Sequence, residues 1–408
     1  MKQTQSWGQI NDNKVLNRYN LHMTHHAILR SSPSLELLIL SSQKEVNIDA
    51  IQSSVSNFTQ EDFKQLHTLS HQHGLYPLLY AGLKVANALP VSEELLNNFK
   101  KSSLRITQQN MLMSAELLNI MKLFQQSSVD AMAFKGPVLG QFAYESVTMR
   151  QYGDLDILIK KSDIQKSVAL LVDQGYQPEI ELNESTIDTF YTCVNVIGLQ
   201  KGSIRVEIHW ELLSTNYAID WDEHTLWSQS ENITINRQSI KALSFENHIL
   251  YLCAHGSKHL FERLEWICDI DRAIRSQERV DWQHLLVEAQ KLGVERMLFL
   301  GLALAKLFFD LPLPQEIIEK SEADPQIKPL VQKVLSIHYS KQKQSKSYST
   351  FWLLWQMREK FTDRLRFAYR GLFAPKFDDF KFIQLPKQLT FLYPLIRPYR
   401  LITKYFYK

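Results

Sequence analysis

Two aspartates separated by a single leucine stand at the head of an apolar run in MRQYGDLDILI, residues 149–159. Successive side chains of a β-strand point to opposite faces, so Asp154 and Asp156 share one face of the expected strand. Two carboxylates this close repel each other, and burying them unpaired costs free energy. We therefore expect a cation between them. Mg²⁺ fits because it takes oxygen ligands and keeps positions for water and substrate phosphates.

A third carboxylate is expected beside this pair. In RVEIHW the same alternation puts Arg205, Glu207 and His209 on one face of a strand. Three carboxylates on neighbouring strands suffice for two divalent ions, Mg²⁺ or Mn²⁺, about 3.5–4 Å apart, which orient an attacking hydroxyl and neutralise a leaving diphosphate. Asp154, Asp156 and Glu207 are thus the predicted metal ligands and catalytic residues. His209 either supports Glu207, faces the substrate or has a structural role.

The turn before this strand has the features of a phosphate-binding loop. FKGP follows a short apolar run and precedes a helical pattern. Gly136 would allow close backbone approach, the helix N-terminus would attract an anion, and Lys135 would supply a point charge. Arg150, just ahead of the acid pair, would add a bidentate contact. The simpler alternative is that Lys135 and Arg150 are salt-bridge partners of the acids.

Changes in the spacing of hydrophobic residues along the chain predict the helices and strands that position these residues. VDAMAF is a short apolar strand, VLGQFAYES is helical, and DLDILI alternates as a strand. A helix then ends at Gly175, and the strand patterns YTCVNVIGLQ and SIRVEIHWEL are joined by a tight turn at Lys201 and Gly202. The order is β-α-β-α-β-β, which predicts a small mixed sheet.

Helical patterns flank this core on both sides, so the predicted class is α+β. The expected parts are a polar, loosely ordered N-terminus (1–30), a helical N-terminal domain (31–127), the catalytic core (128–240), a second helical domain (241–340) and a basic, aromatic-rich C-terminal region (341–408). In the last of these, Pro394 and Pro398 argue against one continuous helix.

Composition indicates an ordered globular protein. The chain has 408 residues, of which 45% are hydrophobic, enough for more than one domain. Its three cysteines form neither a C-x-x-C pair nor an even disulfide framework, which fits a reducing compartment. The first residues lack the apolar region of a signal peptide, and MLFLGLALAKLFF is too short to span a bilayer. We expect a cytoplasmic protein.

The net charge of +3 is unevenly distributed. Residues 341–408 contain 15 Lys and Arg against 4 Asp and Glu, mixed with aromatic residues in helical patterns. Such a segment either packs on its own protein with a basic outer face or lies on an anionic membrane, in which case the protein would be peripheral to the inner face of the membrane. Nucleic acid is the least favoured partner.

Three histidines share one helical stripe, because His248, His255 and His259 follow helical spacing. The pattern is not H-E-x-x-H. The stripe is either a packed face, a wall of the active cleft or a separate metal site.

Taken together, these motifs resemble those of a known family. The stretch from FKGPVLGQFAYES through MRQYGDLDILI, with RVEIHWEL and HGSKHLFERLEWICDIDRAI, resembles the uncharacterised nucleotidyltransferase family of bacteria. The likeness extends over roughly residues 60 to 400. That family is placed in the DNA polymerase β-like nucleotidyltransferase superfamily, whose pattern is an apolar residue, Gly and then Gly or Ser, followed by D-x-D and a distant third acid.

The resemblance implies roles for individual residues. Gly136 matches the motif glycine, Asp154 and Asp156 the metal pair, and Glu207 the third carboxylate. Pro137 departs from the superfamily pattern, because it removes one N–H donor and any hydroxyl from the phosphate loop. Triphosphate binding is the step that this departure affects, and Lys135 would compensate.

The leading hypothesis is a metal-dependent enzyme that transfers a nucleoside monophosphate from an NTP to a hydroxyl or phosphate acceptor. ATP is one expected nucleotide ligand, but the sequence does not name the base of the donor. The expected acceptor is a small molecule, a saccharide or a peptide, and the resemblance implies a place in polysaccharide or modified-peptide biosynthesis. One alternative is a nucleotide-sugar glycosyltransferase, which also uses D-x-D but needs a nucleotide-binding βαβ region of about a hundred residues before it. Another is a non-catalytic scaffold or membrane-surface adaptor that retains the fold.

Overall fold

The chain forms two compact units in the computed structural model, which describes residues 32–90, 92–180, 187–339 and 350–406, with side chains up to residue 403. The predicted polar N-terminus, residues 1–30, lies outside the described residues. Unit 1 comprises Met1–Lys101, Gly256–Asp271 and Phe299–Met357, and unit 2 comprises Ser102–His255, Arg272–Leu298 and Arg358–Lys408. Several helices therefore contribute residues to both units.

Unit 1 contains helices and, among its described residues, no strand. Local signals set where these helices begin: Pro33 and Pro77 occupy first turns, and Thr59 and Asp62 form a capping box. The helices that lie wholly in this unit are α2 (Pro33–Ser42), α3 (Ile48–Val55), α4 (Gln60–Gln72), α5 (Tyr76–Val85), α15 (Gln315–Ala323), α16 (Ile327–Val334), the π-helical turn η3 (Leu335–Tyr339) and α17 (Thr350–Gln356).

Four helices are shared between the units because the chain crosses from one to the other within them. They are α6 (Glu93–Gln126), α11 (Phe245–Lys258), α12 (Leu264–Arg275) and α14 (Glu295–Phe309). None of the described helices combines the length and the hydropathy needed to cross a membrane.

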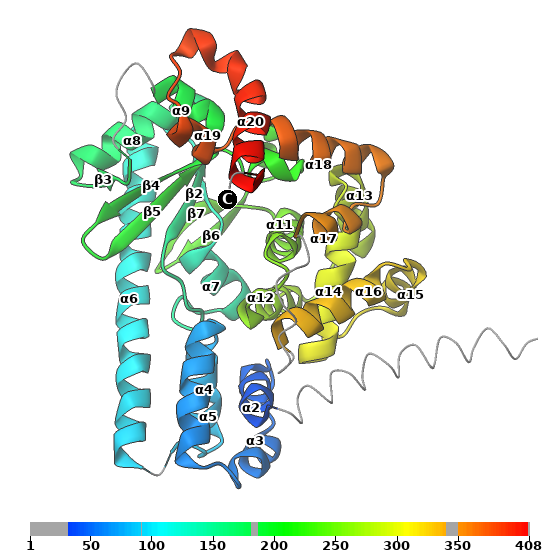
Figure 1. The fold of residues 1–408 in the computed structure, drawn as a ribbon. Coiled ribbons are helices and arrows are strands. Elements are labelled where there is room, and N and C mark those ends of the chain that lie inside the picture. Colours follow the sequence, from blue (N-terminus) through cyan, green and yellow to red (C-terminus); the bar gives the residue numbers. More distant parts are fainter. Residues whose placement is uncertain (1–31, 91, 181–186, 340–349, 407–408) are drawn as a thin grey trace, which may run out of the picture. The chain divides into compact units, whose positions relative to one another are not determined.

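Unit 2 is built on a mixed sheet of seven strands in the order β3-β4-β5-β2-β1-β7-β6 (Figure 1). The central strand β2 pairs antiparallel with β1 and parallel with β5. The strands are β1 (Ala131–Ala133), β2 (Leu155–Ile159), β3 (Gln177–Pro178), β4 (Val196–Lys201), β5 (Ile204–His209), β6 (Glu231–Ile235) and β7 (Gln238–Ala242). The predicted α+β class and mixed sheet are confirmed.

The helices of unit 2 follow the predicted β-α-β-α-β-β order, except that β3 and α9 are inserted before β4 and α9 includes the first residues of the predicted strand YTCVNVIGLQ. They are α7 (Gly136–Tyr144), α8 (Ile164–Asp173), α9 (Ile187–Cys193), α10 (Glu223–Ser228), α13 (Trp282–Leu292), α18 (Phe361–Phe373), α19 (Phe377–Phe382) and α20 (Tyr393–Phe406), with the short helices η1 (Lys161–Asp163), η2 (Thr215–Tyr217) and η4 (Lys387–Leu392).

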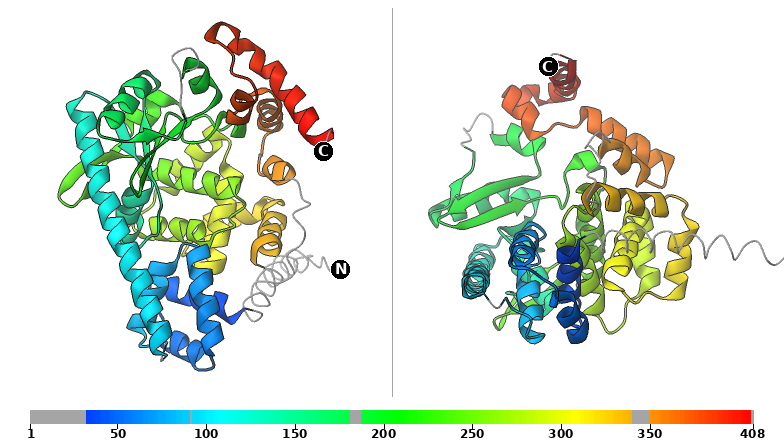
Figure 2. Two further views of the ribbon diagram at one scale, coloured as in Figure 1. Left: turned by 60° about the vertical axis from the view of Figure 1, so that its left-hand side comes forward. Right: turned by 60° about the horizontal axis from the view of Figure 1, so that its bottom comes forward.

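One face of the sheet is apolar and packs against the second half of α6, which lies alongside the strands (Figure 2). The buried cluster joins side chains of that helix to the inward residues of β2 and β5, namely Leu117, Ile120, Met121, Phe124, Leu155, Ile157, Ile159, Val206 and Ile208. This packing stabilises the fold by removing apolar area from water. It also fixes which side chains point to the other face, where the acidic residues lie.

The hairpin of β6 and β7 was not predicted from the sequence. Its two-residue turn uses Asn236 and Arg237, both with positive φ (47° and 66°), a conformation usually taken by Asn-Gly or Asp-Gly. Few of its side chains are buried, with Ile235, Ile240 and Ala242 the inward ones. When most side chains of a hairpin are polar and its turn has no glycine, the sequence shows only a weak alternation of apolar and polar residues, so the strands are hard to recognise.

The interruption expected at Pro394 and Pro398 is wrong, because α20 runs continuously from Tyr393 to Phe406. Pro394 falls in the first turn, where its missing N–H is not needed. Pro398 lies inside the helix, and the contacts of Arg397 and Arg400 on either side of it hold the helix in place.

Those contacts centre on Asp379, whose side chain is fully buried. Arg397 Nη1 lies 3.0 Å from Asp379 Oδ2, and Arg400 Nε lies 2.5 Å from Asp379 Oδ1. Arg397 also donates to the carbonyl oxygen of Gly371 at 2.7 Å and 3.0 Å. The end of the chain is therefore fastened to α18 and α19 by a buried ionic cluster.

We predict that Asp379→Ala costs about 3–5 kcal/mol of folding free energy, because it leaves two buried guanidinium groups without their carboxylate. Chemical denaturation of the full chain measures this change. The control is Asp188→Ala, which removes the exposed pair with Lys387 and is expected to cost about 1 kcal/mol or less. Equal losses in the two variants would contradict the proposed importance of the buried cluster.

Candidate active site

The register of two parallel strands brings two acids together. Asp156 on β2 pairs with Glu207 on β5, and two residues further along each strand Leu158 pairs with His209. Paired positions on adjacent strands point to the same face. Asp156, Glu207 and His209 therefore project from the face opposite the apolar core.

These three side chains form a tight cluster. His209 Nε2 lies 3.1 Å from Asp156 Oδ1 and 3.2 Å from Glu207 Oε2. One candidate ligand atom from each residue lies within 4.8 Å of the other two. The second carboxylate oxygen of Asp156, Oδ2, is buried and has no hydrogen-bond partner among the described residues. A buried carboxylate oxygen without a partner is costly unless a cation binds it.

Lys135 reaches the same carboxylate from the turn between β1 and α7. Its Nζ lies 3.3 Å from Asp156 Oδ1 and 5.5 Å from the centre of the Tyr251 ring. The backbone N–H of Phe134 donates to the carbonyl oxygen of Asp156 at 3.4 Å, which ties the turn to β2. Tyr251 comes from α11 and supplies an aromatic wall that sequence reasoning missed.

Interactions within the cluster favour the charged forms of Asp156, Lys135 and His209. Burial opposes ionisation of Asp156, but the nearby charge of Lys135 and the hydrogen bond from His209 hold the pKa of this carboxyl well below its usual range. Burial likewise acts against protonated Lys135, yet the Asp156 carboxylate raises the pKa of the ammonium. For His209, burial is outweighed by its hydrogen bonds to Asp156 and Glu207, which raise the pKa of the imidazole.

Asp154 lies at the edge of this cluster, immediately before β2. Burial, followed by the charges of Asp156 and Glu207, raises the pKa of Asp154 to about 6. This carboxyl thus feels the repulsion that the D-x-D spacing predicts. It is not among the three residues whose ligand atoms converge within 4.8 Å, so its role as a metal ligand stays a prediction.

Arg205 stands between two of the acids. Its Nη1 lies 2.5 Å from Glu207 Oε1 and 3.6 Å from Asp154 Oδ2, and its Nε lies 2.5 Å from Glu179 Oε1. The guanidinium therefore offsets the negative charge of these carboxylates. Its side chain is 37% exposed, so solvent reaches the guanidinium.

Gly136 joins the turn to the acid pair through the backbone. It has a φ of +52°, and a Cβ at this position would lie 3.2 Å from the carbonyl oxygen of Asp154. Glycine is thus needed both for the left-handed conformation and for the close approach. Pro137 follows in the first turn of α7, where a proline is well accommodated although it offers no N–H.

Arg150 is buried in the loop before β2, with 8% of its surface exposed. Its Nη1 lies 3.5 Å from the carbonyl oxygen of Gln151, and its own carbonyl oxygen accepts from Asn110 Nδ2 at 2.7 Å. Tyr152 donates from its hydroxyl to the carbonyl oxygens of Asn110 and Val147, each at 3.0 Å. This loop is therefore anchored to α6, and a phosphate contact by Arg150 stays a prediction.

The histidine stripe consists of side chains with local partners. His248 is buried, with Nδ1 3.1 Å from the carbonyl oxygen of Leu243 and Nε2 3.0 Å from that of Phe134, and burial lowers its pKa to about 4. His255 Nδ1 lies 3.4 Å from the hydroxyl of Tyr251. His248 thus packs α11 against the end of β1, next to the Lys135 turn.

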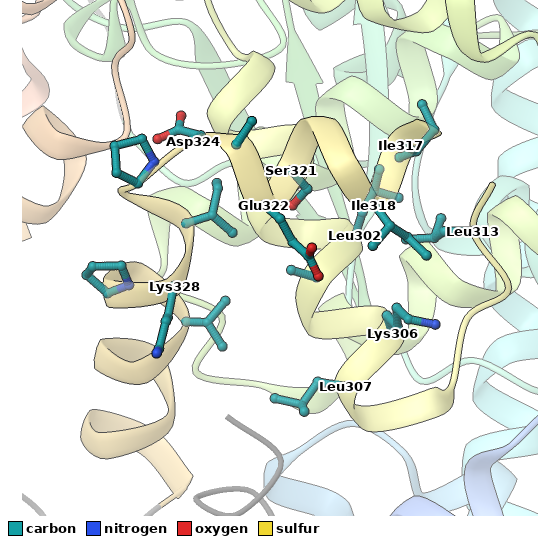
Figure 3. Close-up of a pocket in the computed structure, with 16 residues that line it drawn as sticks. Leu302, Lys306, Leu307, Leu313, Ile317, Ile318, Ser321, Glu322, Asp324 and Lys328 are labelled. Carbon is teal, nitrogen blue, oxygen red and sulfur yellow. The ribbon is translucent and has the colours of Figure 1, made fainter. Parts of the chain in front are cut away.

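Unit 1 contains a cavity of about 680 Å³ between α14, α15 and α16 (Figure 3). Its lining is mostly apolar, as shown by Leu302, Leu307, Leu313, Ile317 and Ile318, with charged side chains such as Lys306 and Glu322 among them. No predicted site residue lines it. The candidate active site is therefore the acidic cluster of unit 2.

The donor set fits a divalent cation. Asp156 and Glu207 offer carboxylate oxygens, which Mg²⁺ and Mn²⁺ prefer, and His209 offers an imidazole nitrogen, which Mn²⁺ tolerates better than Mg²⁺ does. The unpartnered Oδ2 of Asp156 is the observation that most directly supports this fit.

Comparison with models of protein families shows which family the chain belongs to. The model of the uncharacterised nucleotidyltransferase family matches residues 59–310, which include the Lys135 turn, the D-x-D pair and the β5 cluster. The chain belongs to this family. Membership in the uncharacterised nucleotidyltransferase family confirms the resemblance inferred from the motifs and places the protein among transferases.

Two further comparisons add little to this assignment. Among solved structures, the antibiotic-resistance factor ANT(2'')-Ia matches with a TM-score of 0.29 and 11% identity, covering 55% of this chain and 96% of its own. So low a structural similarity carries no argument about this nucleotidyltransferase. No functionally curated protein matches the chain.

From the phosphate-binding role expected of the Lys135 turn, we predict that the chain binds magnesium ATP and that Gly136→Ala weakens this binding by about tenfold or more, because the new Cβ pushes the turn away from Asp154. Isothermal titration measures the affinity. Gly202→Ala is the matched control, since Gly202 has a similar φ of +57° and open space around its Cβ position. Both variants should lose some stability, and equal affinity for ATP in the two would contradict a role for the Gly136 contact.

We also predict that Arg205→Gln raises the affinity for Mn²⁺ about threefold to tenfold, because a guanidinium no longer competes for Asp154 and Glu207. Mn²⁺ electron paramagnetic resonance reports the bound fraction directly. Arg205→Lys retains the charge and should change the affinity less. A lower affinity in Arg205→Gln would show that Arg205 organises the ligands instead of competing with the ion.

Proposed function

We propose that this protein is a metal-dependent nucleotidyltransferase that transfers a nucleoside monophosphate from an NTP to a hydroxyl or phosphate acceptor. The single observation that carries the proposal is the convergence of Asp156, Glu207 and His209 beside the Lys135 turn. Family membership supports the reaction class. The geometry adds a place where a divalent ion and a triphosphate would meet.

Asp156, Glu207 and His209 would hold the ion, with Asp154 as a further ligand. When bound, a divalent ion polarises the phosphoryl oxygens and neutralises the leaving diphosphate. We propose that the carboxylate of Glu207 or Asp156 would accept the proton of an acceptor hydroxyl. The cluster is thus proposed both as ion-binding site and as catalytic centre.

The Lys135 turn is the proposed triphosphate site. Lys135 stays charged because Asp156 raises its pKa, so it offers a full positive charge to a phosphate oxygen. The N-terminus of α7 adds a partial positive charge. It offers one backbone N–H donor fewer than usual, because Pro137 has no N–H. Arg150 is proposed as a further phosphate contact.

The alternatives are less well supported. A nucleotide-sugar glycosyltransferase needs a nucleotide-binding βαβ region ahead of D-x-D, whereas residues 33–126 contain α2 to α6 and no strand among the residues described there. A scaffold that retains the fold would not need an unpartnered carboxylate oxygen beside a buried lysine. For the acceptor we propose a saccharide or peptide hydroxyl, the class that the family resemblance implies.

We predict that Asp156→Asn lowers pyrophosphate release from NTPs by more than about 100-fold, a loss larger than that expected for a residue outside the ligand set. The assay uses the full chain with labelled NTPs and Mg²⁺ or Mn²⁺, and Glu207→Gln should behave alike. Asp130→Asn is the control, because Asp130 pairs with Lys160 on the surface at 2.7 Å. Unchanged release in Asp156→Asn would refute the catalytic assignment.

The donor can be identified before the acceptor is known. Each NTP is screened by thermal shift with and without Mg²⁺, since a ligand that binds only the folded state raises the melting temperature. A shift that requires both the metal and one NTP identifies that NTP as the donor. No shift with any NTP would contradict the proposal independently of the acceptor.

A further inference from the structure

The last helices of unit 2 expose an unusual number of large hydrophobic side chains. Of the 20 such exposed side chains among the described residues, 11 lie in the short stretch from Phe361 to Ile402. We call these eleven the C-terminal apolar face: Phe361, Leu365, Tyr369, Leu372, Phe382, Ile383, Leu389, Phe391, Leu395, Tyr399 and Ile402. Single exposed hydrophobic residues are common, but so dense a group indicates an interaction surface.

The exposed residues of α18 follow one stripe of the helix. Phe361, Leu365, Tyr369 and Leu372 are separated by four, four and three residues, the spacing of one helical face, and they are 65%, 49%, 64% and 43% exposed. The opposite side of α18 carries Phe367, which is buried. The helix is therefore apolar on its outer side as well as its inner side, which is not the pattern of a helix that simply faces water.

Helix α20 has charged side chains on its inner side and hydrophobic side chains on its outer side, the reverse of a typical surface helix. Its inner side carries Arg397 and Arg400, bound to buried Asp379, whereas Leu395, Tyr399 and Ile402 share the outer side. These outer side chains are 69%, 61% and 53% exposed. Figures 1 and 2 show α20, in red, close to α18 and α19 at the C-terminal end of unit 2. A helix that places its arginines inward and its leucine and tyrosine outward is arranged for a non-aqueous neighbour.

The stretch that carries this surface has a net positive charge, although Arg358 and Arg397 are buried within it. Residues 358–403 contain 10 Lys and Arg against 4 Asp and Glu. Lys360, Arg366, Lys381 and Lys387 are exposed, whereas Asp379 is buried and Asp378 is the exposed acid of the stretch. A second copy of the same face would bring like charges together, so self-association is disfavoured.

The combination of exposed aliphatic, aromatic and cationic side chains matches one partner best. Lipid headgroups attract lysine and arginine, while tyrosine, phenylalanine and leucine enter the boundary between headgroups and acyl chains. We propose that the C-terminal apolar face binds the surface of a membrane that contains anionic lipids. Helices α18 and α20 lie on the bilayer without crossing it.

A shallow depression beside the face suits a lipid phosphate. It has a volume of about 470 Å³ and is lined by Asp378, Lys381, Phe382, Arg400 and Thr403. Lys381 supplies an ammonium donor, and the ring of Phe382 belongs to the apolar face. Arg400 is bound to Asp379 at 2.5 Å and to Asp378 at 3.5 Å, and the hydroxyl of Thr403 donates to the carbonyl oxygen of Arg400 at 2.9 Å. A headgroup seated here would have its acyl chains beside Phe382.

Co-sedimentation of the full chain with vesicles tests the proposal. Vesicles of phosphatidylcholine with phosphatidylglycerol should bind the protein, and binding to phosphatidylcholine alone should be at least about tenfold weaker. Raising the salt from about 0.1 M to about 1 M shortens the Debye length from about 10 Å to about 3 Å and should release part of the bound protein. No binding to anionic vesicles at low salt would overturn the proposal.

Paired variants locate the binding surface. Leu395→Ser with Tyr399→Ser should lower vesicle affinity at least about tenfold, whereas Met111→Ser with Leu112→Ser should not, although Met111 and Leu112 are 59% and 50% exposed on α6. The thermal shift with magnesium ATP should be unchanged in both, which separates this test from that of the nucleotide site. Equal vesicle binding by the two variants, or a dimer in light scattering that only the first variant dissociates, would overturn the assignment.

A fluorescent label tests contact with lipid directly. The native thiols of Cys193, Cys253 and Cys268 are buried, so an exposed cysteine can be labelled selectively. A polarity-sensitive dye on Tyr399→Cys should shift its emission to shorter wavelength when anionic vesicles are added, and the same dye on Leu112→Cys should not. Absence of a shift at position 399 would show that the face stays in water.

Discussion

The fold of unit 2 is organised around the charge of Asp156. This carboxylate is almost fully buried, and a buried charge is tolerated only where opposite charge and hydrogen bonds compensate it. Lys135 from the turn and His209 from β5 provide that compensation. The short strand β1, the turn and the β2–β5 pairing must all hold their positions for these contacts to form. The contacts that define the candidate site are therefore also ones that the architecture must satisfy to fold.

Much of the site could be predicted from the sequence because it depends on short-range geometry. The alternation of strand residues places Glu207 and His209 on one side and Val206 and Ile208 on the other, and the structure agrees. The parallel register of Asp156 with Glu207 was outside the reach of such reasoning, since it depends on pairing between segments about fifty residues apart. The same holds for Tyr251, which no local pattern connects to the turn.

Where prediction from sequence failed, longer-range contacts outweighed local preferences. The prolines of α20 oppose a continuous helix, yet the buried cluster of Asp379, Arg397 and Arg400 stabilises it. The β6–β7 hairpin lacks a glycine turn and is recognised only from its pairing with β1. The resemblance to the nucleotidyltransferase family rests on the motifs around Gly136, Asp154 and Glu207. These residues lie in a strand-to-helix turn and in alternating strands, which are the clearest local patterns of the sequence.

The shared use of Lys135 has a consequence for the order in which ligands assemble. Its ammonium is bound to Asp156, and a carboxylate already neutralised by a lysine holds a cation less tightly, just as a lysine already paired holds a phosphate less tightly. Under the proposed function, a cation bound to Asp156 would free Lys135 for a phosphate, and a phosphate bound to Lys135 would free Asp156 for a cation. The two affinities are thus coupled, and by thermodynamic reciprocity the gain in one equals the gain in the other. The Lys135–Asp156 pair neutralises its own charges, and the proposed cation and phosphate would therefore favour each other's binding.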